Sequence, residues 1–390
     1  MACCIGAIYP NKWGQINFMK RKPLHRLEAG LPASWYRDLA QYQRELEAFW
    51  YAGWIAVARE EEIPRPGDWR VARVGSQSIV LSKNEAGELR AFHNTCRHRG
   101  SILCTEESGS FARRRIVCPY HAWTYDLEGR LVATPRRMET PDFDRKNFPL
   151  FDVAVDSWGG FVFVHLGKGS PLKESLKDLP ARFERYRFAD LRIGKRIVAD
   201  VSANWKLLCE NFSECFHCPP VHPEFCAIVT AYQDAGAWGL RNRAEEKPEY
   251  KLGATTLTLD GSSRIPAFRN LNETERNTLY AAEMLPPSLF LNVQPDYVNA
   301  HLMVPTGPQS VRITYDWLFE PQHLPLSEDD LAHYVALWDI TNQQDARNCE
   351  WQQQGIQSRE FDHGYYVPQE FDAHRFTQWV RAGLEAGRMR

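Results

Sequence analysis

Two short stretches of the chain concentrate residue types that ligate metals. The first pairs Cys96 with His98 and, after 19 intervening residues, Cys118 with His121. Two thiolates and two imidazoles can bind a zinc ion, or a [2Fe–2S] cluster with the thiolates on one iron and the imidazoles on the other. The spacing alone leaves both kinds of site open.

Three features of this stretch favour the iron–sulfur cluster. The single residue inside Cys-x-His is a tighter gap than zinc-finger pairs use. Each pair supplies one cysteine and one histidine, so the ligands can be sorted by type onto two irons. Pro119 and Trp123 flank the second pair, as expected for a hydrophobic collar that shields a cluster. Cys104 lies between the pairs without a mate, and we expect it to be a buried thiol.

The second stretch, ECFHCPPVH, runs from Glu214 to His222. Glu214 and His217 are three residues apart and would share one face of a helix. His222 would point away on a continuous helix, so we expect Pro219 and Pro220 to break the helix and return His222 to the same ion. Two imidazoles and a carboxylate are typical ligands of non-haem Fe(II) sites with open positions. The alternative is a pair of ordinary histidines beside a proline turn.

The third ligand of such a site must be a carboxylate from a distant segment. Residues 327–354 predict a long helix that begins with a capping-box pattern, SEDD. At about 100° per residue, one stripe of this helix faces inward. The stripe consists of Leu331, Tyr334, Val335, Trp338, Asn342, Asp345 and Cys349. Asp345 is its carboxylate, at a position where an unpaired charge is expensive, whereas Asp339 and Glu350 point elsewhere. The alternative is an ordinary surface aspartate.

The elements that must position these residues differ along the chain. Residues 33–49 have helical spacing, with Trp35, Leu39 and Leu46 on one side. Residues 49–166 read as short alternating strands separated by turns, and 167–180 read as a linker. Beyond them we expect a strand at 196–203, a helix at 204–217, further strands at 252–259, 288–305 and 310–320, and then the long helix.

These elements predict an α+β fold in three segments. Residues 1–48 form a helical segment that packs on the C-terminal domain. Residues 49–166 form an all-β metal-binding domain. Residues 167–390 form a catalytic domain in which helices cover an antiparallel sheet.

The bulk composition narrows the class of protein. The 390 residues are 44% apolar and 25% charged, with a net charge of −2, which gives no drive toward nucleic acid or an anionic membrane. No apolar run approaches the roughly 18 residues of a membrane span. The first residues do not have the pattern of a secretory signal, so we expect a cytoplasmic protein. For such a protein, the ten cysteines are expected to be metal ligands or free thiols rather than to form disulfides.

Three segments resemble one enzyme family. CRHRG and CPYHAWTYDLEGRL are similar to a Rieske [2Fe–2S] domain, and NWKLLCENFSECFHCPPVHPE resembles the catalytic segment of Rieske non-haem iron oxygenase α subunits. NQQDARNCEWQQQG resembles the segment that carries the third iron ligand of that family.

The resemblance implies a role for each candidate residue. Cys96 and Cys118 would hold one cluster iron, and His98 and His121 the other. His217, His222 and Asp345 would hold a mononuclear Fe(II), and Glu214 would be the acidic bridge between the two centres. Many members that act on aromatic rings have Asp at the bridge position, where this chain has Glu.

The resemblance also implies partners. The family usually forms homotrimers in which the Rieske centre of one subunit faces the iron of the next, so that His121 and Glu214 would be the handover pair. The chain has no Gly-rich dinucleotide fingerprint. A separate NAD(P)H-dependent flavin/iron–sulfur reductase is therefore expected, with O2 and a small molecule as substrates.

Within the family, further segments are similar to the branch that acts on quaternary ammonium compounds. They include ENFSECFHCPPVHPE, LPPSLFLNVQPDYVNAHLMVP and QDARNCEWQQQGIQS followed by GYYVPQEF. That branch performs N-demethylation by methyl hydroxylation, or C–N cleavage. Phe216, Trp351 and Gln353 depart from the usual residues of the branch.

Aromatic side chains could desolvate a cationic substrate of this kind. Candidates in the second half are Phe212, Phe216, Tyr232, Trp238, Phe290 and Tyr297. Two alternative functions are hydroxylation of an aromatic acid or small alcohol at the same iron, and electron transfer by a non-catalytic Rieske carrier. The presence of Glu214, His217, His222 and Asp345 argues against the carrier.

Overall fold

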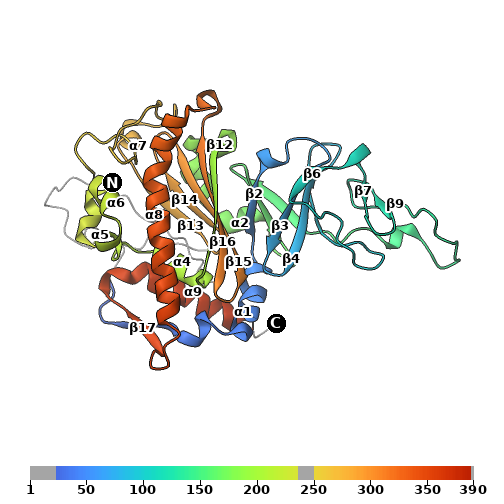
Figure 1. Ribbon diagram of the computed structural model, residues 1–390, viewed down its shortest axis with the longest axis horizontal. Helices are drawn as coiled ribbons and strands as arrows, with labels where there is room; N and C mark the ends of the chain where they lie inside the picture. The colour runs from blue at the N-terminus through green and yellow to red at the C-terminus, as the bar shows by residue number, and fades with distance from the viewer. Residues whose placement is uncertain (1–22, 236–249, 388–390) are drawn as a thin grey trace. The chain divides into compact units, whose positions relative to one another are not determined.

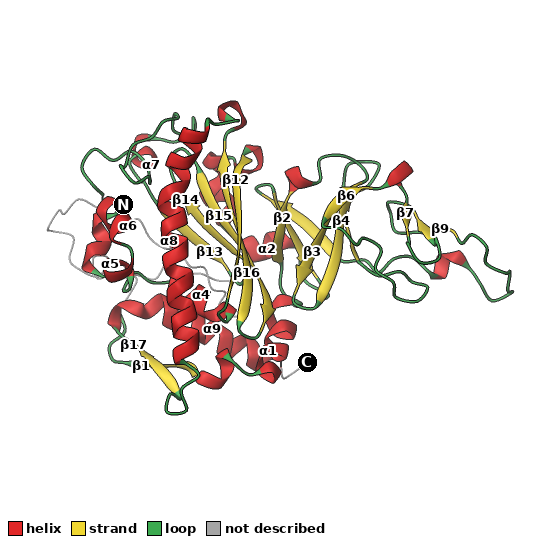
Figure 2. Ribbon diagram, in the orientation of Figure 1, coloured by secondary structure: helices red, strands yellow, loops and turns green. Residues whose placement is uncertain are grey.

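The computed structural model describes residues 23–235 and 250–387 (Figure 1). The chain divides into two compact units, one from Trp50 to Ser175 and one that combines the chain before Trp50 with the chain from Leu176 onward. The first unit consists mainly of strands and loops, and the second combines helices with a sheet (Figure 2). This arrangement confirms the predicted α+β class. None of the helices in the described ranges has the length and hydrophobicity that a bilayer crossing needs.

The unit from Trp50 to Ser175 contains three small antiparallel sheets. One has the order β10-β11-β2, with β10 at Ala154–Trp158, β11 at Phe161–His165 and β2 at Ile55–Arg59. The second has the order β5-β4-β3-β6, formed by Leu89–His93, Gln77–Lys83, Asp68–Val74 and Ser108–Ser110. The third joins β7 (Ile116–Val117), β8 (Thr124–Tyr125) and β9 (Leu131–Ala133). The predicted all-β character of this region is confirmed.

The core of this unit includes the candidate thiols. Cys96, Cys104 and Cys118 are all buried in one cluster with Trp69, Phe92 and Tyr125 among others. Cys104 is the buried thiol that the sequence predicted, and burial raises its pKa to about 12.

The second unit is built on one five-stranded antiparallel sheet. Its order is β12-β16-β15-β14-β13. The strands are Arg192–Val201, Ser310–Phe319, Val298–Gly307, Leu289–Val293 and Ala281–Leu285 in that order. Helix α8 (Glu328–Gly355) lies along one face of this sheet (Figure 1). The predicted antiparallel sheet covered by helices is therefore present.

Shorter elements complete the second unit. Helices α4 (Trp205–Phe212), α5 (Cys218–Val221) and α6 (Pro223–Ile228) follow β12, and α7 covers Glu273–Arg276. Strand β1 (Glu28–Pro32) pairs with β17 (His363–Tyr366), and α9 (Phe371–Gly387) ends the described chain. Two short helices, α2 (Leu172–Leu176) and α3 (Leu179–Phe183), occupy half of the segment 167–180 that was predicted to be a linker, and the two compact units divide within this segment, between Ser175 and Leu176.

The predicted helix at 33–49 is broken into pieces and buries a different face. A 3-10 turn at Ala33–Tyr36 precedes α1 (Leu39–Glu45), and a π-helical turn covers Leu46–Trp50. Leu39, predicted to face inward, is 61% exposed, whereas Glu45 is fully buried. Leu46 is buried as predicted, and the inward face combines such apolar side chains with Glu45, which lies opposite a buried lysine.

That lysine is Lys206 on α4. Its Nζ lies 2.8 and 2.7 Å from the two carboxylate oxygens of Glu45, and Trp205 Nε1 donates to the same carboxylate at 2.8 Å. Both ionic side chains are 0% exposed. Buried charges of this kind are tolerated only when they are paired and hydrogen-bonded. The pair therefore fixes the N-terminal segment against the helix that leads into the second metal-ligand stretch.

Replacing Lys206 with methionine should destabilise the protein by about 3–5 kcal/mol, because Glu45 is left as an unpaired buried charge. The measurement is the midpoint of urea unfolding followed by circular dichroism. The double variant Glu45→Gln/Lys206→Met removes the stranded charge and should recover most of the loss. A Lys206→Met protein that unfolds at the wild-type urea concentration would show that the pair does not hold the segment.

Two further predictions were wrong. Residues 252–259 form turns rather than a strand, because the loop closes on itself: Thr255 N donates to Gly261 O at 2.7 Å and Gly261 N to Thr258 O at 3.1 Å. The helix predicted at 204–217 ends at Phe212, where Ser213 caps it by donating its hydroxyl to Cys209 O. Glu214 and His217 therefore do not share a helix face.

Candidate functional site

The two Cys/His pairs lie on turns with the same hydrogen-bond pattern. Cys96 accepts from Gly100 N at 3.0 Å and donates its own N–H to Ser101 O at 2.8 Å. Cys118 accepts from Ala122 N at 3.0 Å and donates to Trp123 O at 2.8 Å. The fourth residue after each cysteine, Gly100 or Ala122, has a positive φ. Two equivalent turns thus present two thiols and two imidazoles.

The four side chains are sorted by type. Cys96 and Cys118 are each 2% exposed, whereas His98 and His121 are exposed. The two imidazole centroids are 4.7 Å apart. A pair of buried sulfurs beside a pair of surface imidazoles suits a cluster whose two irons have different ligands, and suits an electron exit through the imidazoles. The donor set therefore fits a Rieske [2Fe–2S] cluster.

The surroundings of the imidazoles differ in part from the predicted collar. Trp123 is buried and stacks on His98 with centroids 4.8 Å apart and an interplanar angle of 8°. Pro119 is exposed to solvent, unlike the predicted collar residue. The ring of Tyr120 lies against His121 instead, at 3.8 Å between centroids.

Sequence reasoning missed Tyr125, which contacts a candidate ligand directly. This fully buried residue of β8 places its hydroxyl 3.3 Å from Cys96 Sγ, and the hydroxyl accepts from Arg97 N at 3.2 Å. Since a cysteine sulfur that ligates a metal carries no proton, the Tyr125 hydroxyl would be the donor to it when a cluster is bound. Hydrogen bonds to ligand sulfurs raise the reduction potential of a cluster because they stabilise its more negative, reduced form.

Replacing Tyr125 with phenylalanine should therefore lower the potential of the cluster. A hydrogen bond to a charged group contributes roughly 1.5–3 kcal/mol, and about 1.4 kcal/mol corresponds to about 59 mV for one electron. Since only part of this bond depends on the redox state, we expect a decrease of about 50–100 mV. Redox titration followed by EPR measures it, with Tyr120→Phe as a control whose potential should not move. Equal potentials for Tyr125→Phe and wild type would contradict the assigned hydrogen bond.

The second stretch and the long helix meet at one point. His222 Nε2 lies 2.9 Å and His217 Nε2 3.4 Å from Asp345 Oδ1. One ligand atom from each residue lies within 4.8 Å of the others, the arrangement required for a shared metal ion. Two imidazoles and one carboxylate suit a mononuclear Fe(II) with open positions.

The chain reaches this arrangement differently from the predicted way. After α4 ends, residues 213–217 form a turn, and α5 starts at Cys218 with Pro219 and Pro220 in its first turn. Proline at this position costs nothing because the first N–H groups of a helix have no partner within it. The prolines therefore start a helix rather than break one, and His222 lies just after that helix ends.

Each histidine is oriented by a hydrogen bond to its other nitrogen. His217 Nδ1 lies 2.5 Å from Glu214 Oε1, and the other Glu214 oxygen accepts from the backbone N–H groups of Phe216 and His217. His222 Nδ1 lies 2.7 Å from Gln344 Oε1. Both Nδ1 atoms thus donate, which leaves both Nε2 atoms free to ligate a metal.

Charge at the triad also favours a cation. Burial alone would raise the pKa of Asp345, but hydrogen bonds from His217 and His222 hold it well below its usual range. Burial alone would lower the pKa of His217, but the Glu214 and Asp345 carboxylates raise it well above its usual range. A carboxylate that stays ionised is the form that binds metal.

Three supporting residues were not found from the sequence. Asn211 Nδ2 donates to Asp345 Oδ1 at 3.0 Å, and Gln344 Nε2 donates to Glu224 Oε2 at 3.1 Å. Gln344 immediately precedes Asp345, and Asn211 lies one turn of chain before Glu214. The sequence does place the amide residues of NQQD and ENF next to expected ligands. Amide residues are just as common on the surfaces of helices, however, so this position alone did not indicate a supporting role.

The candidate aromatic residues fall into three environments. Phe212 stacks on Phe290 at 4.7 Å between centroids and lies 6.3 Å from the ring of His301. Tyr297 is fully buried against other rings, and Tyr232 packs on Phe225. Phe216 is 42% exposed, and Trp238 lies outside the described residues. Phe212 and Phe290 are thus the pair on the sheet face that looks toward α4.

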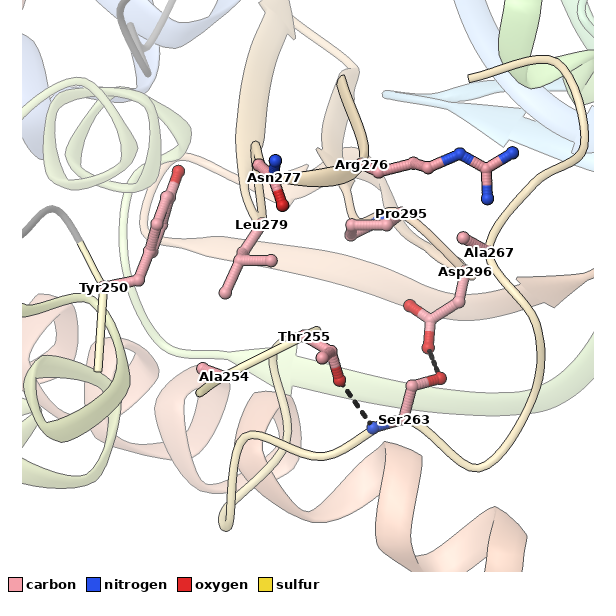
Figure 3. Close-up of a pocket in the computed structure, with 10 residues that line it drawn as sticks. All are labelled: Tyr250, Ala254, Thr255, Ser263, Ala267, Arg276, Asn277, Leu279, Pro295 and Asp296. Carbon is pink, nitrogen blue, oxygen red and sulfur yellow. Dashed lines mark hydrogen bonds between the residues drawn. The ribbon is translucent and has the colours of Figure 1, made fainter. Parts of the chain in front are cut away.

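A cavity of about 440 Å³ lies elsewhere in this unit (Figure 3). Asp296 lines it and points at Ser263, whose hydroxyl donates at 2.5 Å. Burial raises the pKa of Asp296 to about 6 in spite of this bond. No triad residue lines the cavity.

Two segments of the chain match known protein families. Residues 53–144 match the Rieske [2Fe-2S] domain, and residues 188–386 match the ring hydroxylating alpha subunit (catalytic domain).

Relatives with assigned names match most of the chain. The glycine betaine monooxygenase oxygenase subunit of Pseudomonas aeruginosa is 29% identical over 381 residues, which cover 90% of this chain and 87% of that protein. The subunit of the same name from Chromohalobacter salexigens is 30% identical and covers 90% and 84%. The carnitine monooxygenase oxygenase subunit of Acinetobacter baumannii is 29% identical and covers 84% and 85%.

Solved structures share the fold. A quaternary ammonium Rieske monooxygenase, studied for carnitine oxidation and inter-subunit electron transfer, superposes with a TM-score of 0.71 at 22% identity, over 92% of this chain and 96% of that one. Naphthalene 1,2-dioxygenase from Rhodococcus sp. gives a TM-score of 0.68 at 18% identity, over 91% and 94%. At these identities the likeness establishes the fold alone.

Proposed function

We propose that this chain, which belongs to the Rieske non-haem iron oxygenase α subunits, hydroxylates an N-methyl group of a substrate. The proposed substrate is a small quaternary or tertiary ammonium compound. The convergence of His217, His222 and Asp345 at one point carries the proposal. The similarity to glycine betaine and carnitine monooxygenase subunits over most of the chain supports the substrate class.

In this proposal each ligand set holds one cofactor. Cys96, His98, Cys118 and His121 hold the [2Fe–2S] cluster, and the triad holds the mononuclear iron. When bound, the cluster supplies electrons and the iron activates O2.

The reaction balances without an acid–base residue. The methyl group, O2, two electrons and two protons give a hydroxymethyl group on nitrogen and one water. The hydroxymethyl ammonium then breaks its C–N bond, and the bonding electron pair stays on nitrogen. Formaldehyde and a proton leave. The protein has only to place the methyl group beside the triad and to desolvate the cation.

Side chains near the triad suit a cation. The faces of Phe212 and Phe290 each stabilise an ammonium group by roughly 0.5–2 kcal/mol. Asp345 adds a negative charge that hydrogen bonds from His217 and His222 keep ionised, against the effect of burial.

Electrons would arrive from another subunit. We propose a homotrimer in which the exposed His121 of one subunit meets Glu214 of the next, with a separate NAD(P)H-dependent flavin/iron–sulfur reductase as the source. The hydrogen bond between Glu214 and His217 supports a direct path from the bridge to the iron ligands.

A substrate panel tests the proposed function. Purified protein loaded with iron and sulfide is supplied with dithionite-reduced mediator and O2, and formaldehyde is assayed with betaine-type ammonium compounds, aromatic acids and small alcohols. We expect formaldehyde from one or more ammonium compounds and no hydroxylated aromatic acid. Turnover of aromatic acids alone would replace the proposed substrate class. Cluster reduction with no turnover of any compound would favour a Rieske electron carrier.

A further inference from the structure

A buried polar cluster lies on the sheet of the catalytic unit, surrounded by apolar side chains. Asn292 accepts from Tyr280 OH at 3.0 Å, and its amide Nδ2 lies 3.4 Å from Asn299 Oδ1. His301 Nε2 lies 2.6 Å from the same Asn299 oxygen and 3.2 Å from Asn292 Nδ2. Asn292 and Asn299 are 0% exposed and His301 is 7% exposed. Polar groups this deep need a structural or functional reason.

The strand register places this cluster on the face that looks toward α4. Asn292 pairs with Asn299 and Phe290 with His301, so all four side chains share one face of the sheet. Phe290 on that face stacks on Phe212 of α4. The cluster therefore adjoins the aromatic pair assigned to the cation.

Helix α8 covers the same cluster. Trp338 packs on Tyr280 with ring centroids 5.7 Å apart, at the end of the cluster remote from His301. Asp345, two turns further along α8, is close enough to His301 to act on its charge state. Asn342 lies between Trp338 and Asp345 on the inward stripe and is 6% exposed. Asn342 thus lies on the inward stripe of α8 between Trp338, which packs on the polar cluster, and Asp345 of the triad.

Two amide groups here have no hydrogen-bond partner in the described part of the chain. They are Asn299 Nδ2 and Asn342 Nδ2, both buried. Asn299 already uses its oxygen for His301 and Asn292. Both unpartnered atoms are donors, so a ligand that satisfies them must present an acceptor. A carboxylate is the strongest acceptor for such donors.

The buried part of the same face offers such a carboxylate no compensating positive charge. On β13–β16 it carries Ala282, Met284, Phe290, Asn292, Asn299, His301, Met303, Ile313, Tyr315 and Trp317, none of which is Lys or Arg. Lys195 of the edge strand β12 lies on this face opposite Trp317, but it is exposed to solvent. Burial lowers the pKa of His301 to about 3, so its imidazole is neutral. A simple anion would be buried unpaired here, whereas a zwitterion brings its own cation.

We infer that Asn299 and Asn342 bind the carboxylate of an ammonium carboxylate substrate, with the N-methyl end beside Phe212 and the triad. This inference rests on the proposed function and narrows it to zwitterions, in preference to cationic amino alcohols that share the same ammonium head. Asn299 and Asn342 are specificity residues in this assignment, and Asn292 and His301 position Asn299.

Calorimetric binding tests the assignment. Glycine betaine and choline share a trimethylammonium head and differ in carboxylate against hydroxyl. We expect wild-type holoprotein to bind glycine betaine at least about tenfold more tightly, since charge-assisted hydrogen bonds are worth roughly ten- to a hundredfold in affinity. Asn342→Asp should weaken glycine betaine binding by at least about tenfold and leave choline binding unchanged or stronger. Gln343→Glu makes the same chemical change at an exposed neighbour on α8 and should alter neither affinity.

A second variant of Asn342 and a comparison of affinity ratios make the binding test conclusive. Asn342→Leu keeps the branched shape and the number of heavy atoms but removes the amide, and it should lose the preference even if Asn342→Asp does not fold. Unchanged ratios of the two affinities in folded Asn342 variants, compared with Gln343→Glu, would overturn the inference and leave the proposed function standing. Absence of binding by any ammonium compound to wild type would overturn both.

Discussion

Asp345→Ala protein should retain its [2Fe–2S] cluster and lose its mononuclear iron. Asp345 is the only carboxylate of the triad, and its Oδ1 faces both His217 Nε2 and His222 Nε2. Removing it leaves two neutral ligands, and Fe(II) binds two isolated imidazoles weakly. The cluster ligands lie in the other compact unit, so they should be unaffected.

Metal and sulfide analysis measures this effect. We expect wild type to contain three irons and two sulfides per chain, and Asp345→Ala to contain two of each with an unchanged Rieske EPR signal. Asp339→Ala is the matched control on α8, because its carboxylate accepts from Gln343 and lies away from the triad. If Asp345→Ala kept three irons and activity while Glu350→Ala lost them, the assignment of the third ligand would be wrong.

Glu214→Gln should keep both metal centres and slow electron transfer between them. Glutamine has nearly the same volume, and its carbonyl oxygen can still accept from His217 Nδ1, although its amide group no longer accepts from the backbone N–H groups of Phe216 and His217. The three iron ligands are unchanged, so the iron site should persist. In the proposed trimer, the negative charge between His217 and the partner's His121 is lost, and with it the charge-assisted hydrogen bond that would link them. Changes to partners of metal ligands typically cost about 10–100-fold, and we expect that decrease in the rate of cluster oxidation.

Stopped-flow absorbance of the reduced cluster, mixed with substrate and O2, gives this rate. Glu224→Gln is the control, because Glu224 supports the other iron-ligand histidine one step further away, through Gln344. It should leave the rate within about threefold of wild type. A wild-type rate in Glu214→Gln would mean that electrons reach the iron by another route.

The meeting of His217, His222 and Asp345 was predicted from the sequence more accurately than the backbone that presents these side chains. Asp345 could be placed because a 28-residue helix carries one inward stripe over many turns. Glu214 and His217 were assigned to a helix that ends at Phe212. Helix ends depend on single hydrogen bonds, such as that from the Ser213 hydroxyl, which leave no periodic signal.

Long-range polar contacts were out of reach for a different reason. Leu39 looked like a core residue, but the buried partner of the N-terminal segment is Lys206, some 160 residues away. Asn299 and His301 sit in an ordinary strand pattern and become informative only when β14 and Asn292 lie beside them. A role for Tyr125 could likewise be assigned only from the distance between its hydroxyl and Cys96 Sγ.

A single-turnover experiment tests most directly whether the two centres act together on an N-methyl group. Protein with both metals filled is reduced anaerobically, freed of reductant, and mixed with O2 and the ammonium compound that binds most tightly. We expect the cluster to be re-oxidised rapidly. The yield of formaldehyde should approach one equivalent per mononuclear iron, to the extent that neighbouring clusters supply the electrons. Slow cluster oxidation that ignores the compound, with no formaldehyde, would contradict N-demethylation at this site.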